Sequence, residues 1–276
     1  MNKSLSMVVG LLAVAVAVHA MSLRAQDRAP AGDAAKHPEK PVKILMTSQT
    51  QGFVHDSIPL GKEIVSQLAG KSGPFEVTID DELKHCTAEG LKAFDIVMFV
   101  NTTKEPKIDE AQKQALLEFI QSGKGFVGVH AATDTFYEWP AYGEMIGGYF
   151  DKHPWNANDT VTIKVEKPDH AIVKPFGDAP FELTEEIYQM REPYDRRKCE
   201  VLLSLETSKT DMTKKGIKRT DGDFAVAWIK PYGEGRVFYT SLGHNQAVWR
   251  DERFQRHLAA GIEWASGVGE DAKIGE

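Results

Sequence analysis

The chain has 276 residues, a formal net charge of −7 and two cysteines. With this acidic balance and no basic tract, we expect neither a nucleic acid nor an anionic membrane surface as a partner. Cys86 and Cys199 are too few for a disulfide framework; in an exported protein they could pair, but two separate thiols are the favoured interpretation, and no oligomeric state is predicted.

The N-terminal segment has the pattern of a secretory signal peptide. It begins with Met1-Asn2-Lys3, continues with an apolar run over residues 7–18, and offers small-residue processing sites before residue 26. We therefore predict a signal peptide over residues 1–25 and a flexible leader over residues 26–41, which is rich in Ala, Pro, Asp and Lys. No later segment approaches the roughly 20 apolar residues of a membrane helix, so the mature protein is expected to be periplasmic or secreted without a membrane attachment.

Strands and helices then alternate along the chain. Residues 43–48 form a short apolar strand, and Asp56 and Ser57 are suitable N-cap residues for a helix that runs through Leu68. Residues 75–79 alternate as in a half-buried strand, and residues 95–100 are almost continuously apolar, as in a central strand. A helix is predicted to start at Asp109 and to end at Ser122-Gly123, before a buried strand over residues 125–129.

The second half is richer in strands. Residues 137–155 form an aromatic and glycine-rich stretch that we interpret as a long functional loop. Further strands are expected over residues 161–165, near Ile187, and over residues 201–205 and 224–229. The last of these turns back into residues 236–240 as a hairpin, and a helix over residues 251–264 closes the domain.

This pattern predicts an α/β domain over residues 42–267, followed by a tail over residues 268–276. The predicted architecture is flavodoxin-like: an open, mostly parallel sheet with helices on both faces and an added β-hairpin. In such sheets ligands bind beyond the carboxyl ends of the strands. The loops that carry His55, His130 and His244 all leave strands at that edge, so we expect these histidines to converge.

Five separated motifs resemble the ThuA-like family, which is named for trehalose utilisation. They are VHAATDTFY at 129–137, GGYF at 147–150, HPW at 153–155, EEIY at 185–188 and GRVFYTSLGH at 235–244. The resemblance implies a fold of the class I glutamine-amidotransferase-like superfamily and an association with carbohydrate metabolism.

The amidotransferase reaction itself is argued against by two positions. Amidotransferases of that fold carry a cysteine at the nucleophile elbow, where this chain has His130, and a glutamate two residues after the late histidine, where it has Gln246. Without the cysteine there is no thiolate to attack glutamine. A histidine at the end of this strand predicts acid–base work or metal binding instead.

We assign candidate catalytic roles to His130, Asp134 and His244. His130 and His244 stand at strand exits, whereas Asp134 either moves a proton, orients the imidazole or caps the next turn. His130, His153 and His244 are also a candidate site for a divalent metal such as zinc, although no metal-ligand spacing motif is present and each of them could instead be a structural histidine.

Other residues are candidates for binding a small carbohydrate. The candidate ligand-binding side chains are His55, Glu144, Trp155, Glu186 and Tyr188. Trp139, Tyr142, Trp155 and Trp249 are candidate aromatic platforms for a sugar ring, although such residues more often pack in the core.

Three functional hypotheses follow. The first is an exported enzyme, a hydrolase, isomerase or lyase, that acts on a sugar or an oxidised keto-sugar by histidine and carboxylate chemistry or with metal assistance. The second is a non-catalytic carbohydrate-binding module that retains an amidotransferase-like cleft. The third, an interaction domain fused to other catabolic modules, fits the leader but not the single-domain length.

Overall fold

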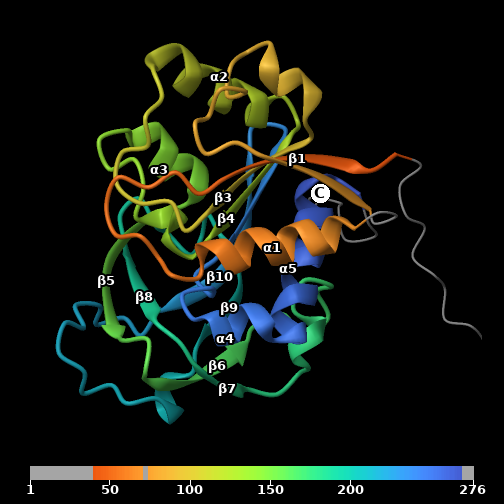
Figure 1. The fold of residues 1–276 in the computed structure, drawn as a ribbon. Coiled ribbons are helices and arrows are strands. Elements are labelled where there is room, and N and C mark those ends of the chain that lie inside the picture. The colour runs from red at the N-terminus through yellow and green to blue at the C-terminus, as the bar shows by residue number, and fades with distance from the viewer. Residues whose placement is uncertain (1–39, 71–73, 269–276) are drawn as a thin grey trace, which may run out of the picture. The chain divides into compact units, whose positions relative to one another are not determined.

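The computed structural model describes residues 40–70 and 74–268 (Figure 1). The predicted signal peptide, most of the leader and nearly all of the predicted tail lie outside these residues. Within them, every helix is too short or too polar to cross a bilayer. Cys86 and Cys199 are both free and buried, as expected.

A nine-stranded sheet forms the centre of the described structure, in the order β2-β1-β3-β4-β11-β10-β9-β6-β7. Its strands are β1 (Val42–Thr47), β2 (Phe75–Ile79), β3 (Ile96–Val100), β4 (Gly125–Val129), β6 (Thr160–Val165), β7 (Phe181–Thr184), β9 (Glu200–Leu205), β10 (Ala225–Tyr232) and β11 (Gly235–Thr240). The first five strands in the sheet order are parallel and follow the 2-1-3-4-5 order of flavodoxin-like folds. This half of the sheet confirms the predicted α/β fold.

The other half of the sheet is antiparallel and larger than a single added hairpin. β10 and β11 form the predicted hairpin, and β9, β6 and β7 then continue the sheet through antiparallel pairs. β7 was not predicted, because the apolar–polar alternation of Phe181–Thr184 spans only four residues, which is the shortest run that indicates a strand.

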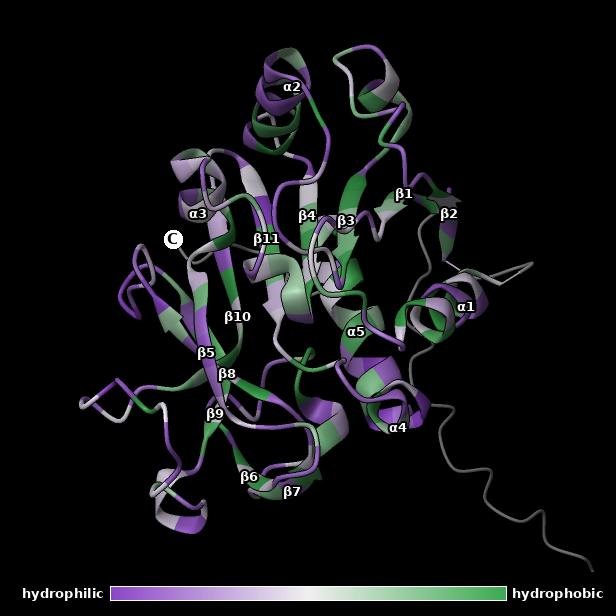
Figure 2. Cartoon of the chain, turned by 60° about the vertical axis from the view of Figure 1, so that its left-hand side comes forward, coloured by the Kyte–Doolittle hydropathy of each residue, from purple (hydrophilic) through white to green (hydrophobic). Residues whose placement is uncertain are grey.

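Helices cover both faces of the parallel half. The longer ones are α1 (Ile58–Ala69), α2 (Glu110–Gln121) and α5 (Glu252–Ala265), and the shorter ones are α3 (Pro140–Ile146) and α4 (Gln246–Arg250). α1, α4 and α5 pack on one face and α2 and α3 on the other, because successive residues of each strand point to opposite cores (Figures 1 and 2). Ile96 and Met98 of β3, for example, enter one core, and Val97 and Phe99 enter the other.

Of the two helix starts with predicted N-cap residues, one has the expected side-chain cap and the other does not. The Asp109 side chain accepts a hydrogen bond from the Gln112 N–H, and Gln112 reaches back to the Asp109 N–H, which completes a capping box at the start of α2. Ser57 precedes α1 but makes no side-chain cap; its hydroxyl donates instead to the Gly243 carbonyl at 3.2 Å. Ser57 thus joins the loop after β1 to the loop after β11.

The stretch over residues 137–155 is not a long loop. It forms α3, which ends at Gly147 in the left-handed conformation with φ 101°, and then β5 (Tyr149–Trp155). β5 pairs with β8 (Ile187–Arg191) in a separate two-stranded antiparallel sheet. Because β5 alternates irregularly and pairs with a strand more than 30 residues away, the sequence pattern did not predict it.

Close packing of α5 on β11 depends on a glycine. A methyl group on Gly261 would lie 2.1 Å from the Phe238 Cε1 atom. Alanine normally stabilises a helix by about 1 kcal/mol relative to glycine, but overpacking a core costs roughly 1–3 kcal/mol.

Because an approach of 2.1 Å puts this clash at the upper end of the range, we expect Gly261→Ala to lower the free energy of unfolding by about 2 kcal/mol after the helix gain, measured by denaturant unfolding. Arg256→Ala, on the exposed face of the same helix, is the control and should change this free energy by less than about 0.5 kcal/mol. A Gly261→Ala protein as stable as the parent would show that α5 does not depend on this close approach.

Candidate functional site

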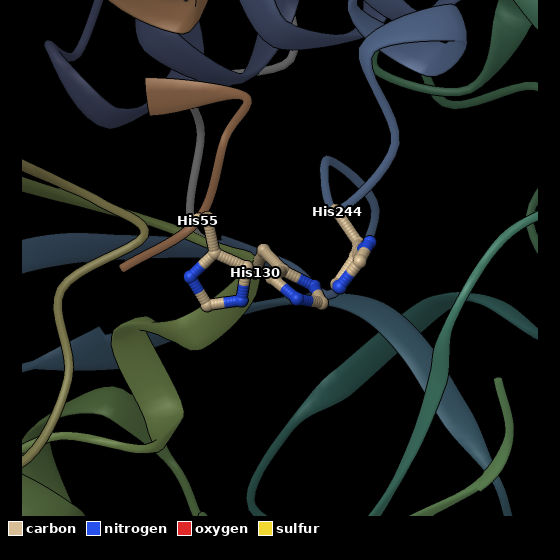
Figure 3. A group of neighbouring side chains, drawn as sticks. All are labelled: His55, His130 and His244. Atoms are coloured by element: carbon tan, nitrogen blue, oxygen red, sulfur yellow. The ribbon is translucent and has the colours of Figure 1, made fainter. Parts of the chain in front are cut away.

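Three histidines from separate loops meet at the carboxyl edge of the parallel strands (Figure 3). His55 follows β1, His130 follows β4, and His244 follows β11. The ring centroids are 4.9 Å apart for His55 and His130 and 5.2 Å apart for the other two pairs. One nitrogen of each ring lies within 4.8 Å of the others. The expected convergence of these three side chains is thus present.

His130 occupies a sharp turn at the end of β4. Its φ of 50° lies in the left-handed region, which non-glycine residues rarely adopt and which is typical of residues held at functional turns. The ring is fully buried. Its Nδ1 lies 2.7 Å from the Ser241 carbonyl oxygen, so Nδ1 carries the proton and donates it. Nε2 is therefore the basic nitrogen, and it accepts a hydrogen bond from the Tyr188 hydroxyl at 2.8 Å.

His244 and His55 complete the cluster from two different loops. His244 follows Gly243, whose φ of 114° permits the turn after β11, and its Nδ1 lies 3.2 Å from the Asn245 side-chain oxygen. His55 is 5% exposed, and its Nδ1 has no hydrogen-bond partner among the described residues. A buried ring nitrogen without a partner is costly and indicates that the site is built for a ligand.

Burial keeps all three imidazoles neutral. It lowers the pKa of His55 to about 4, with a further contribution from the nearby His244. Burial lowers the pKa of His130 well below its usual value, helped by His55, and burial also lowers the pKa of His244. Neutral imidazoles have a free lone pair, which is the form that binds a metal ion or accepts a proton.

Glu186 lies among the histidine side chains. Its carboxylate oxygens are 3.7 Å from His130 Nε2, 3.7 Å from His244 Nε2 and 3.3 Å from His153 Nδ1. Burial, together with the nearby charge of Asp134, raises the pKa of Glu186 to about 7. Glu186 therefore exchanges its proton near neutral pH, as a general acid or base requires.

Glu185 is a buried carboxyl group that supports the His244 loop. It accepts hydrogen bonds from the backbone N–H groups of His244, at 2.6 Å, and Asn245, at 3.1 Å. Burial raises the pKa of Glu185 to about 8, although these N–H groups lower it. In the sequence Glu185 occurs within the motif EEIY at 185–188, and no role for it is predicted from the sequence. Its only signal in the sequence is an acidic residue two positions before the buried segment Ile187-Tyr188.

The remaining candidate residues occupy varied positions. His153 is 43% exposed and contacts Glu186. It does not belong to the group of three close histidines, whose third member is His55. Asp134 accepts a hydrogen bond from the Tyr137 hydroxyl and forms an ion pair with Lys104. Among the described residues, it makes no hydrogen bond to His130. The carboxylate beside His130 is therefore Glu186 and not Asp134.

Two predicted sugar-binding residues lie elsewhere. Trp155 is fully buried, and its indole N–H donates a hydrogen bond to the Asp211 carbonyl. Its apolar ring therefore packs in the core and is not available to a sugar. Glu144 lies on α3, half-exposed, 3.8 Å from Lys198. Of the predicted aromatic platforms, Tyr142 and Trp249 are also fully buried, and Trp139 packs against Phe136.

The cysteines lie outside the histidine cluster and are not activated. Burial raises the pKa of Cys86 to about 12 and that of Cys199 to about 11, so both remain thiols at neutral pH. This agrees with the argument from His130 against thiolate chemistry.

The ThuA family model, described as trehalose utilisation, matches residues 43–265. The chain belongs to the ThuA family. Two solved ThuA-like proteins share the fold: one from Bacteroides uniformis, at 25% identity with a TM-score of 0.68, and one from Parabacteroides merdae, at 20% identity with a TM-score of 0.62. The alignments cover 85% and 86% of this chain, and 95% and 94% of theirs.

The ThuA fold is also found inside larger proteins. A β-galactosidase from Bacillus circulans matches 82% of this chain over 31% of its own length, at 12% identity with a TM-score of 0.55, which shows a common fold alone. No curated protein matches the sequence.

The raised pKa of Glu185 predicts a pH-dependent stability. The folded pKa of about 8 exceeds the ordinary value of 4.5, so the stabilisation is complete below about pH 4.5 and is lost as the pH rises through 8. The substitution Glu185→Gln removes this titration, so its own effect on the free energy of unfolding is the same at every pH.

We compare the free energy of unfolding of the metal-free parent with that of Glu185→Gln. The difference, parent minus variant, is expected to fall by at least about 2 kcal/mol between pH 5 and pH 9. Denaturant unfolding across this pH range measures the difference, with Glu182→Gln, at an exposed glutamate of β7, as the control. Parallel pH profiles for the parent and Glu185→Gln would contradict the assignment.

Proposed function

We propose that this ThuA-family protein is an enzyme that binds one divalent metal ion through His55, His130 and His244 and acts on a sugar or keto-sugar. The observation that carries the proposal is the meeting of three neutral imidazoles from three separate loops. Histidine nitrogens from separate loops suit zinc and similar ions.

The surroundings of the three rings fit a metal ion. The Ser241 carbonyl fixes the proton of His130 on Nδ1, which is the usual arrangement for a metal-binding histidine and leaves Nε2 as the donor atom. The Tyr188 hydroxyl would give up its hydrogen bond to Nε2 when the ion binds. A bound divalent ion supplies a Lewis acid that polarises a carbonyl or hydroxyl oxygen of the substrate.

Glu186 is the proposed proton-transfer group. It is 12% exposed and contacts three histidines, so a substrate at the cluster lies within its reach. From this position Glu186 can remove a proton from a carbon next to a carbonyl, or protonate a leaving oxygen. His153, on the exposed side of Glu186, is positioned to stabilise the carboxylate form.

A carbohydrate substrate is supported by the family, whose description is trehalose utilisation. We also propose that the protein is exported, on the basis of the signal-peptide pattern over residues 1–25. Neither a nucleic acid nor a membrane surface is proposed as a partner, since the chain is acidic.

The alternative function is a non-catalytic carbohydrate-binding module. In such a module we expect aromatic faces to dominate the cleft and titratable groups to be dispersed. His130, His244 and Glu186 lie together instead, and this favours the enzyme.

The metal proposal is tested by zinc titration of the metal-free protein. We expect one zinc ion per chain and a loss of affinity of at least about 100-fold in His130→Ala, because one of three ligands is removed. His85→Ala, at a surface histidine paired with Asp80, is the matched control and should bind zinc like the parent. His153→Ala should retain the one-to-one stoichiometry, whereas an equal loss in His153→Ala and His130→Ala would favour the ligand set with His153.

The catalytic proposal is tested by a turnover screen with trehalose, glucose and their keto derivatives. We expect Glu186→Gln to lower kcat about 10²–10⁴-fold, because the proton-transfer group is removed, while zinc still binds. Equal turnover by the parent and Glu186→Gln would remove Glu186 from the mechanism. Tight sugar binding without turnover by the parent would favour the binding module.

A further inference from the structure

Asn101 is a fully buried polar residue directly after β3, the strand that lies between β1 and β4 in the sheet. The loop that it begins carries no histidine, unlike the loops after β1 and β4. The φ of Asn101 is 53°, in the left-handed region, and His130 at the end of the neighbouring β4 has a φ of 50°. A left-handed backbone is uncommon outside glycine and is often found at functional sites. Asn101 is therefore a candidate part of the histidine site.

The side chain of Asn101 connects two of the histidine loops. Its Nδ2 donates a hydrogen bond to the Ser57 hydroxyl at 3.0 Å, and Ser57 lies two residues after His55. The same nitrogen donates to the Gly243 carbonyl at 3.2 Å, and Gly243 directly precedes His244. One buried amide thus holds the loop after β1 and the loop after β11 at a common distance.

The backbone of Asn101 reaches the third histidine loop. Its N–H donates to the Val129 carbonyl at 3.2 Å, and Val129 directly precedes His130. This bond continues the β3–β4 pairing one residue beyond the match of Val100 with Val129. The hydrogen bonds of Asn101 therefore end next to each of the three loops that carry the clustered rings (Figure 3).

The partners of the Asn101 amide fix the direction in which it faces. The Gly243 carbonyl can only accept, and it also accepts from the Ser57 hydroxyl at 3.2 Å and from the Trp249 indole N–H at 2.8 Å. The amide atom that faces it must therefore be the nitrogen. The Asn101 Oδ1 is buried without a hydrogen-bond partner among the described residues. Such an atom costs free energy, so stability alone does not account for an amide at this position.

We propose that Asn101 is a positioning residue of the histidine site. Its amide sets the separation of the loops that carry His55 and His244, and its N–H aligns the turn at His130. This inference rests on the proposed metal site, because zinc accepts histidine nitrogens only near 2.0–2.1 Å and the ligand loops must therefore be held in register. Groups that orient metal ligands typically contribute about 10–100-fold to metal affinity.

The test is zinc titration of the metal-free parent, Asn101→Asp and Asn101→Gly. Aspartate keeps the shape of the side chain and tolerates the left-handed backbone but lacks the amide donors, whereas glycine removes the side chain without backbone strain. We expect both variants to bind zinc about 10–100-fold more weakly, because the three ligands lose their common tether. With cobalt(II) as a spectroscopic probe, the visible absorption typical of tetrahedral coordination should weaken in both variants.

Gln189→Leu is the matched control for the loss of a buried amide. Gln189 is fully buried, its Nε2 donates to the Gly216 carbonyl at 2.8 Å, and its Oε1 accepts from the Lys218 N–H at 2.9 Å. Neither partner lies in a histidine loop. Gln189→Leu should therefore lower the free energy of unfolding and leave the zinc affinity and the cobalt spectrum as in the parent.

Amide hydrogen exchange of the metal-free proteins tests the same contacts without an ion. We expect residues 49–58 and 241–246 to exchange faster in both Asn101 variants than in the parent, because the two loops are no longer joined through the amide. In Gln189→Leu the exchange of these two segments should equal that of the parent.

The outcomes separate this proposal from the proposed function. Equal zinc affinities and cobalt spectra in the parent and both Asn101 variants would overturn the positioning role and leave the metal site intact. An equal loss of zinc affinity in Gln189→Leu would also overturn the role, because affinity would then follow general stability. A parent that binds no zinc would overturn the metal site; faster exchange of the two loops would then still support the tether, and unchanged exchange would overturn it.

Discussion

The candidate site depends on one hydrogen bond, from the buried His130 Nδ1 to the Ser241 carbonyl. It joins the exits of β4 and β11, which are adjacent parallel strands, and it fixes which ring nitrogen carries the proton. With Nδ1 protonated, Nε2 must face Tyr188 and Glu186. The parallel order of β1, β3, β4 and β11 thus places the histidines together, and this bond sets the chemistry that His130 can perform.

The fold of the parallel half followed from the sequence, because its signals are local and periodic. β3 reads as a continuous apolar run since it is buried on both faces, and the Asp109 capping box starts α2 where expected. The convergence of His55, His130 and His244 followed from topology alone, since all three leave parallel strands at one edge.

The rest of the site depends on long-range pairing that local patterns do not encode. Glu185 and Glu186 reach the histidines because β8 pairs with β5 and turns the segment before Ile187 toward the cluster. No spacing in the sequence distinguishes Glu186 from Asp134 as the carboxylate beside His130. Trp155 was similarly assigned to the ligand from its residue type, yet it is buried, because it lies on β5 where that strand pairs with β8.

The central claim is that three neutral imidazoles form one metal site. The most direct test is the anomalous diffraction of crystals of the zinc-loaded protein, recorded at the zinc absorption edge. The account predicts a single strong peak within about 2.0–2.1 Å of one nitrogen each from His55, His130 and His244. A peak held by other residues, or no peak at these rings in fully zinc-loaded protein, would contradict it.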